Sequence, residues 1–198
     1  MKQYEVYPEC NVDTNLVGHI LGGYPKHKST CNEVTKAVNN ADGFAIGIID
    51  ADKRQATMDP GFVEVNKLDL SSPNEYEHDH VTMYVHKDCK RYMFTVKPAM
   101  DMFILHAAQH QGVDMKSEGF AANLDGFKKQ TKRIQAAEDP QLRKLFDKIK
   151  GYPELVRLRN TLRYLMQYQL DADVEVAKRF FNGELSKEDL IPMLTCFC

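Results

Sequence analysis

The chain has 198 residues, of which 43% are hydrophobic and 27% are charged. That length corresponds to one domain, or one domain with a small addition, and the composition supports a buried core and excludes a wholly disordered chain. The 26 basic and 28 acidic residues leave a formal net charge of −2, which excludes a histone-like coat for nucleic acid but allows a local basic patch.

The sequence also indicates in which cellular compartment we expect the protein. No apolar run reaches the roughly 18–20 residues that a membrane span needs, and the first residues contain no apolar stretch of signal-peptide length. The five cysteines are an odd number without a CxxC pair, which is typical of a reducing compartment. The terminal Cys196 and Cys198 could bind metal or oxidise, although an isolated CxC is more often incidental. We therefore expect a cytoplasmic protein with no membrane contact.

The first part of the chain alternates strand-like and helix-like segments. A helix capped by Asp13 or Thr14 should stop at Gly22, and a second should be capped by Ser29 or Thr30. The apolar run after it predicts a strand covered on both faces, as in a parallel sheet. The elements expected here are strand 3–8, helix 13–21, helix 30–40 and strand 43–49. This order is typical of a βαβ unit, in which a right-handed crossover joins two parallel strands.

The middle of the chain predicts more strands, and the last third predicts helices. A strand over 62–70 precedes two strands that flank Cys89-Lys90, which indicates a hairpin. The expected elements are strands 81–88 and 91–98, then helices 99–111, 126–137, 140–150, 153–169, 172–182 and 186–194. We expect an α/β domain over residues 1–117 and a helical C-terminal region over 118–198, or one continuous domain.

Acidic residues follow two of the predicted strands. Glu9 ends the first strand shortly before Asp13, and Asp50 and Asp52 follow the apolar strand 43–49. If these strands are adjacent and parallel, their carboxyl ends meet at one edge of the sheet. Several carboxylates at one spot repel each other, and a hard divalent cation such as Mg²⁺ or Mn²⁺ removes that conflict.

The spacing of Asp50 and Asp52 leaves other interpretations open. An Asp after a strand is often a turn or helix-cap residue. The string also resembles the start of a calcium loop, but Arg54 and Gln55 stand where that loop requires a ligand and a glycine.

The strings PECNVDT and GFAIGIIDADKR together resemble the TOPRIM domain of topoisomerases, bacterial primases and the overcoming-lysogenization-defect nucleases. In that family a Glu follows the first strand and an Asp-x-Asp follows a later hydrophobic strand. By this resemblance Glu9 is the general acid/base or a metal ligand, Asp13 is the trailing acid, and Asp50 and Asp52 are metal ligands. The resemblance implies a TOPRIM-like (Rossmann-like), mostly parallel sheet flanked by helices, here with an added β-hairpin and a helical C-terminal part.

The resemblance covers roughly residues 3–70 and has departures. Cys10 replaces the glycine that usually follows the Glu, and Lys53-Arg54 replace small residues after the aspartates. The pattern places no tyrosine as a topoisomerase nucleophile, and the chain is too short for strand passage or primer synthesis.

Further candidate residues carry positive charge or lie near a strand end. Lys53 and Lys97 are candidate catalytic cations, and Asp101 is a candidate metal ligand, although it could simply favour a helix N-terminus. The candidate substrate-binding residues are Asp13, Arg54, Lys128, Lys129, Lys132 and Arg133. The basic run is equally typical of a solvated helix face.

The histidines indicate a metal site less clearly than the acidic residues do. The string Glu77–His80, with His86 nearby, has metal-ligand residue types but no complete zinc spacing, so a polar loop is favoured. His106 and His110 share a helix face without the Glu of a HExxH motif, and we expect core or surface roles for them.

The sequence therefore predicts a Mg²⁺- or Mn²⁺-dependent phosphoryl-transfer protein, most concretely a nuclease acting on DNA or RNA. The alternative is a non-catalytic module that binds nucleic acid or nucleotide, in which the acids are structural. In either case the helical C-terminal region could dock a protein partner or a second copy.

Overall fold

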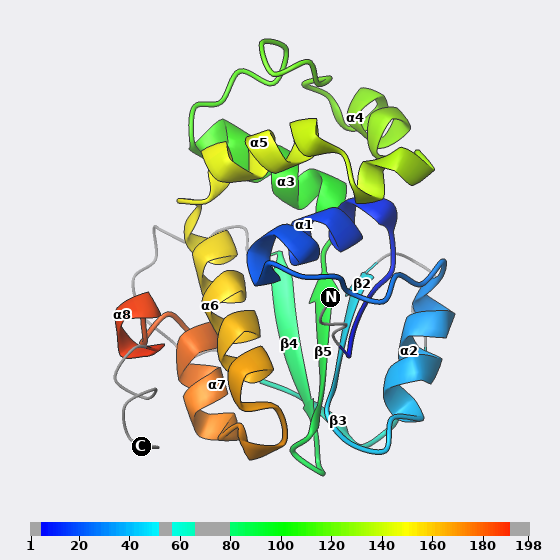
Figure 1. Ribbon diagram of the computed structural model, residues 1–198, viewed down its shortest axis with the longest axis vertical. Helices are drawn as coiled ribbons and strands as arrows, with labels where there is room; N and C mark the ends of the chain where they lie inside the picture. The colour runs from blue at the N-terminus through cyan, green and yellow to red at the C-terminus, as the bar shows by residue number, and fades with distance from the viewer. Residues whose placement is uncertain (1–4, 52–56, 66–79, 191–198) are drawn as a thin grey trace.

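The computed structural model describes residues 5–51, 57–65 and 80–190. These residues form a five-stranded sheet with the order β1-β2-β5-β4-β3 (Figure 1). The strands are β1 (Val6–Pro8), β2 (Ala45–Asp50), β3 (Phe62–Glu64), β4 (Val81–His86) and β5 (Arg91–Val96). The expected strands are thus present, although residues 66–70 of the third expected strand lie outside the described residues.

The sheet is mixed, which corrects the expectation of a mostly parallel one. β1 pairs with β2, and β2 with β5, in parallel. β5 pairs with β4, and β4 with β3, in antiparallel fashion. The physical reason is the short turn between β4 and β5, because only antiparallel strands can be joined so tightly. The predicted hairpin is confirmed, but it is built into the sheet, with β5 beside β2.

Eight α-helices and two 3₁₀ segments accompany the described strands. The first three are α1 (Asn11–Leu21), α2 (Cys31–Asn39) and α3 (Met100–His110). The later ones are α4 (Leu124–Thr131), α5 (Pro140–Ile149), α6 (Pro153–Tyr168), α7 (Val174–Phe181) and α8 (Lys187–Leu190), with 3₁₀ turns η1 (Ile134–Ala137) and η2 (Gln169–Asp171). The chain is therefore α/β with a helical last third, as expected. None of the described helices has the length and apolarity of a membrane span.

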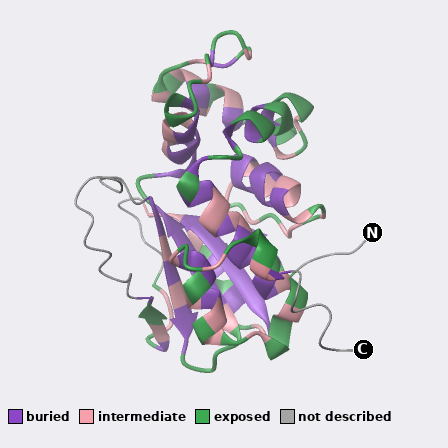
Figure 2. Cartoon of the chain, turned by 90° about the vertical axis from the view of Figure 1, so that its left-hand side faces the viewer, coloured by how far each residue is buried: buried purple, intermediate pink, exposed green. Residues whose placement is uncertain are grey.

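The two faces of the sheet have separate hydrophobic covers. Val34 and Val38 of α2 pack with Ile49 and Met93 on one face. The opposite face belongs to a larger cluster that contains Ile46, Ile48 and Phe94 and includes side chains of α1, α3, α5, α6 and α7. All of β2 except its last residue is buried, which confirms the expected strand covered on both faces. Figure 2 shows buried residues along the strands at the centre of the molecule.

Helix α1 begins two residues earlier than expected. Its N-cap is Cys10 instead of Asp13 or Thr14, and Asp13 lies in the first turn. The carboxylate of Asp13 accepts a hydrogen bond from the Cys10 backbone N–H at 3.3 Å. The helix stops at Gly22, whose φ of 63° lies in the left-handed region that glycine adopts without strain. The predicted stop and the predicted Thr30 cap of α2 are both confirmed.

The predicted division after residue 117 lies in the segment between α3 and α4. The larger hydrophobic cluster continues across this position, because it joins Leu16 of α1 to Leu145 of α5 and Leu162 of α6. Figure 1 shows α5 and α6 against α1 and the sheet. The helical last third is thus packed on the α/β part through a shared core.

Candidate functional site

The carboxyl ends of β1 and β2 open into one large cavity of about 880 Å³. We call it the carboxylate cavity, because Glu9, Asp50 and Asp101 all line it. Its walls come from the segments after β1 and β2, from the start of α3, and from α4 and the residues that follow it. Figure 1 shows α4 near the N-terminal end of α1, where these segments meet.

Backbone pairing brings Glu9 and Asp50 together. Pro8 lies opposite Ile48 in the parallel ladder, and the Glu9 N–H continues that ladder by donating to the Ile48 carbonyl at 3.0 Å. The Glu9 Oε2 atom in turn accepts the backbone N–H of Asp50 at 3.0 Å. The sequence prediction that these two acids meet at one edge of the sheet is therefore confirmed by their positions.

Asp50 and Asp101 are both tied to helices. Asp50 Oδ1 accepts the backbone N–H of Met100, the first residue of α3, at 2.8 Å. Asp50 thus satisfies an N-terminal N–H of a helix distant in the sequence, although the N-cap residue of α3 is Ala99. Asp101 is buried, and its Oδ1 accepts the hydroxyl hydrogen bond of Thr131 in α4. These bonds hold both carboxylates in fixed positions on the cavity wall.

Burial and mutual repulsion raise the pKa values of acidic side chains at the site. Burial, with the charges of Glu9 and Asp101, raises the pKa of Asp50 to about 7, although the Met100 N–H and Lys128 act in the opposite direction. Burial and the charge of Asp50 raise the pKa of Asp13 well above its ordinary value. Carboxylates whose pKa values rise in this way are an electrostatic conflict that a bound cation relieves.

Two lysines of the predicted basic run reach the carboxylate cavity. Lys128 and Lys132 line it, whereas Lys129 and Arg133 are exposed and lie off its wall. The spacing explains the division, because residues four apart share a helix face and their immediate neighbours do not. Lys128 therefore lies near the acids, whereas Lys129 and Arg133 face solvent. Binding of phosphate by this run stays a prediction.

Asp13 lies behind the cavity wall. It is fully buried, and its Oδ1 accepts the Cys10 thiol at 2.8 Å. Burial and the charge of Asp13 raise the pKa of the Cys10 thiol well above its ordinary range. Cys10, in the place where the resemblance expects glycine, lines the cavity beside Glu9, whereas Asp13 does not line it.

Other candidates lie beside the site or outside the described part. Lys97 is exposed at the end of β5 and is not part of the cavity wall, although the next residues, Pro98 and Ala99, are. Asp52, Lys53 and Arg54 lie outside the described residues, as do Glu77 to Asp79.

The donor set of the cavity suits a divalent cation only in part. Carboxylate oxygens around an open, water-accessible cavity suit Mg²⁺, which often takes one or two protein carboxylates and completes its shell with water and phosphate oxygens. Residues 5–51, 57–65 and 80–190 contain no group of three or more His, Cys, Asp or Glu side chains arranged to hold a metal. The described residues therefore fit a cation that one or two carboxylates would hold, and Glu9 and Asp50 are the candidates.

Sequence reasoning missed several wall residues. Thr131, His27 and Ser29 line the carboxylate cavity, and Thr131 bonds to Asp101 across a separation of 30 residues. No local pattern marks them, because they reach the site through the packing of α4 and the loop after α1. The lone His27 is linked to Thr14 at 2.9 Å, a contact that only the folded chain reveals.

A second polar cluster is buried between β4 and α6. His80 Nδ1 lies 3.0 Å from Glu154 Oε2, and His80 Nε2 lies 2.6 Å from His106 Nδ1. Glu154 also accepts the Val81 backbone N–H at 2.6 Å. His80, expected in a polar loop, is thus buried, and Glu154 gave no signal in the sequence. The cluster ties α6 and α3 to β4.

Neither a protein-family model, nor a curated protein, nor a solved structure matches the chain.

Proposed function

We propose that this protein is a Mg²⁺- or Mn²⁺-dependent, TOPRIM-like nuclease that hydrolyses phosphodiesters of DNA or RNA in the carboxylate cavity. The observation that carries the proposal is the meeting of Glu9, Asp50 and Asp101 with Lys128 on one cavity wall. Three neighbouring parallel strands, β1, β2 and β5, also support a TOPRIM-like arrangement, with the acids where the first two strands end.

In this proposal Glu9 and Asp50, with Asp52 from the resemblance, hold the cation. The bound cation would supply a Lewis acid for phosphoryl oxygens and would lower the pKa of water. Lys128 and Lys132 bind phosphate oxygens and offset the negative charge that grows on them in the transition state. Lys53, Arg54 and Lys97 are proposed to add positive charge from the neighbouring loops.

The reaction itself is hydrolysis. The water oxygen bonds to phosphorus, the bond from phosphorus to one sugar oxygen breaks, and that oxygen leaves as a hydroxyl group after taking a proton from a solvent water molecule. Glu9 is the proposed acceptor of the proton that the attacking water loses.

The test is cleavage of end-labelled single- and double-stranded DNA and RNA with Mg²⁺, with Mn²⁺ or with EDTA. We expect cleavage only with a cation, a loss of about 100-fold or more in Asp50→Asn, and a smaller loss of about tenfold in Lys128→Gln. The matched control is Lys129→Gln, on the same helix but off the cavity wall, which should cleave like the wild type. Equal cleavage by Asp50→Asn and wild type would remove the nuclease proposal.

A non-catalytic nucleic-acid-binding module is the second candidate. The observation in its favour is that the described part of the chain lacks a three-residue metal group. This candidate predicts binding without cleavage in the same assay. Binding should weaken with salt and in Lys128→Gln, because each lysine contributes a phosphate contact.

A further inference from the structure

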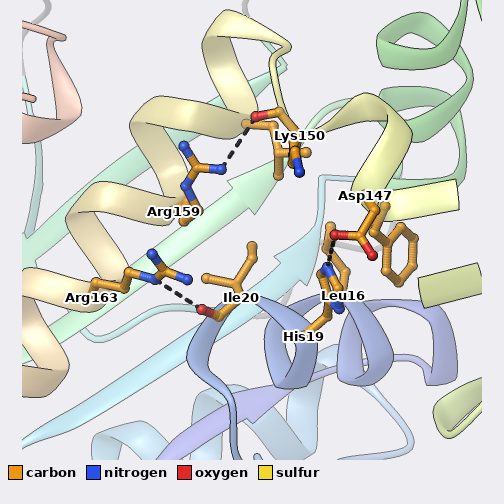
Figure 3. A pocket seen from close by; sticks show the side chains of 9 residues that line it. Leu16, His19, Ile20, Asp147, Lys150, Arg159 and Arg163 are labelled. Atoms are coloured by element: carbon orange, nitrogen blue, oxygen red, sulfur yellow. Dashed lines mark hydrogen bonds and ion pairs between the residues drawn. The ribbon is translucent and has the colours of Figure 1, made fainter. Parts of the chain in front are cut away.

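A second pocket lies at the opposite end of α1. It has a volume of about 130 Å³ and is enclosed by α1, α5 and α6 (Figure 3). The carboxylate cavity meets α1 at Asn11, and this pocket meets it from Leu16 onward. The two sites share no lining residue, so they are distinct.

Positive charge dominates the rim of this pocket. Lys150, Arg159 and Arg163 line it, and Asp147 is its one acidic lining residue. Asp147 is exposed and lies 3.4 Å from His19 Nε2. Three cations against one carboxylate leave an excess of positive charge, which favours an anion with more than one negative charge.

Two hydrogen bonds to helix ends orient the arginines. Arg163 Nε donates to the Ile20 carbonyl at 3.0 Å, and Arg159 Nη1 donates to the Lys150 carbonyl at 3.3 Å. Figure 3 shows both guanidinium groups extending from α6 toward the pocket. Each guanidinium has five N–H groups in a rigid fork, which matches the oxygens of phosphate. The bonds to the helix ends thus leave donors for a ligand.

Arg159 adds an independent sign of a missing partner. Its Nε atom is buried and has no hydrogen-bond partner among the described residues. A buried N–H group without a partner costs free energy. An anion bound to the same guanidinium would offset part of that cost through its charge. Burial and the neighbouring Arg163 also lower the pKa of Arg159, so the arginines repel each other until an anion lies between them.

The floor of the pocket limits what can enter. Leu16, Ile20 and Phe146 form an apolar base that excludes bulk water and strengthens charge interactions above it. The volume holds a phosphate group and a few further atoms, but it is below the range of pockets that enclose whole drug-sized ligands.

We propose that this pocket binds the phosphate group of a phosphomonoester or free inorganic phosphate, held by Arg159, Arg163 and Lys150. The phosphate could belong to the 5′ end of a nucleic acid or to a free anion, and both present the same dianionic group. The inference needs no divalent cation, so it stands apart from the proposed nuclease activity.

The test is calorimetric titration in EDTA at constant ionic strength. The probes are inorganic phosphate and one oligonucleotide in 5′-phosphorylated and 5′-hydroxyl forms. We expect phosphate to bind the wild type and to bind Arg159→Gln and Arg163→Gln about tenfold or more weakly. Preference for the 5′-phosphorylated over the 5′-hydroxyl oligonucleotide would identify a nucleic-acid end, whereas binding of inorganic phosphate without that preference would identify a free anion.

Two further variants keep the test decisive if the arginine variants fold poorly. Asp147→Asn removes the competing carboxylate from an exposed position and should bind phosphate several-fold more tightly. Lys36→Gln removes an exposed charge on α2 and should bind phosphate like the wild type. The proposal is overturned if no probe binds the wild type, or if Asp147→Asn and Lys36→Gln change the affinity equally. EDTA prevents cation-dependent cleavage, so loss of nuclease activity alone would leave this result unaffected.

Discussion

Asp50 is the residue on which the electrostatics of the carboxylate cavity depend most. It accepts the Met100 N–H, lies next to Glu9, and has a pKa raised from its ordinary 3.8 to about 7. A carboxyl group whose pKa is raised by folding stabilises the protein below its unfolded pKa. That contribution is lost as the pH rises through the folded value.

The wild type should therefore lose stability between about pH 4 and about pH 7 in EDTA, and Asp50→Asn should lose less. The difference in pKa corresponds to about 4 kcal/mol at most, so we expect Asp50→Asn to be more stable than the wild type by about 2–4 kcal/mol near pH 8. Urea unfolding at several pH values measures this. Asp42→Asn, on an exposed loop, is the matched control, and an Asp50→Asn profile parallel to the wild type would contradict the prediction.

Some of the candidate site residues could be predicted from the sequence, and others could not. Glu9 and Asp50 could be predicted because a strand end fixes where the next side chain lies. Lys128 and Lys132 could not be separated from Lys129, because the sequence does not say which face of α4 turns inward. Asp13 was expected to cap α1 or to bind substrate but is fully buried in the first turn, since α1 begins at Asn11 and turns it toward Cys10.

At the scale of elements, the strands followed from apolar runs, and the parallel β1–β2 pair and the β4–β5 hairpin followed from their order, whereas the place of the hairpin in the sheet did not. Strand β2 was predictable because residues 45–49 are all apolar or glycine and lie between two hydrophobic layers. Its parallel pairing with β5 depends on where the β4–β5 hairpin inserts. The position of the hairpin in the sheet is determined by packing between segments that are distant in the sequence, and no local sequence pattern indicates it.

The packing of α2 on β2 requires glycine at position 47. A Cβ atom there would lie 2.4 Å from Met93 Sδ, 2.9 Å from Val34 Cγ1 and 3.0 Å from Val38 Cγ2. Gly47→Ala should therefore destabilise the protein by about 1–3 kcal/mol in urea unfolding. Gly43→Ala is the control, because its nearest neighbour would be Leu170 Cδ2 at 3.6 Å, and it should be nearly neutral. Equal stability of the two variants would refute this account of the interface.

At the scale of the whole molecule, one polar side chain links α1 to the helical last third. Asn15 is buried and donates to the carbonyls of Ala136 at 2.8 Å and Asp139 at 2.9 Å. It also accepts the Arg143 Nε–H at 3.1 Å. The same segment of chain follows α4, which carries Lys128 to the carboxylate cavity. Folding of the last third and assembly of the cavity are thus coupled.

Asn15→Ala should leave these groups without partners and destabilise the protein by about 3 kcal/mol. We also expect faster amide exchange in α4 and η1, because their tie to α1 is lost. Asn32→Ala, exposed on α2, is the control. Unchanged exchange in α4 would mean that the Asn15 hydrogen bonds do not hold this part of the last third. The suggestion that this region also docks a partner stays a prediction.

The proposed chemistry depends on Glu9 and Asp50 holding one divalent cation in the carboxylate cavity. Calorimetric titration of Mn²⁺ near pH 7.5, with about 0.15 M salt to screen exposed acids, tests it most directly. We predict one binding event in the wild type, weakened about tenfold or more in Glu9→Gln and in Asp50→Asn and unchanged in Asp42→Asn. Binding of Mn²⁺ with the same affinity in all four proteins, or in none of them, would contradict the account.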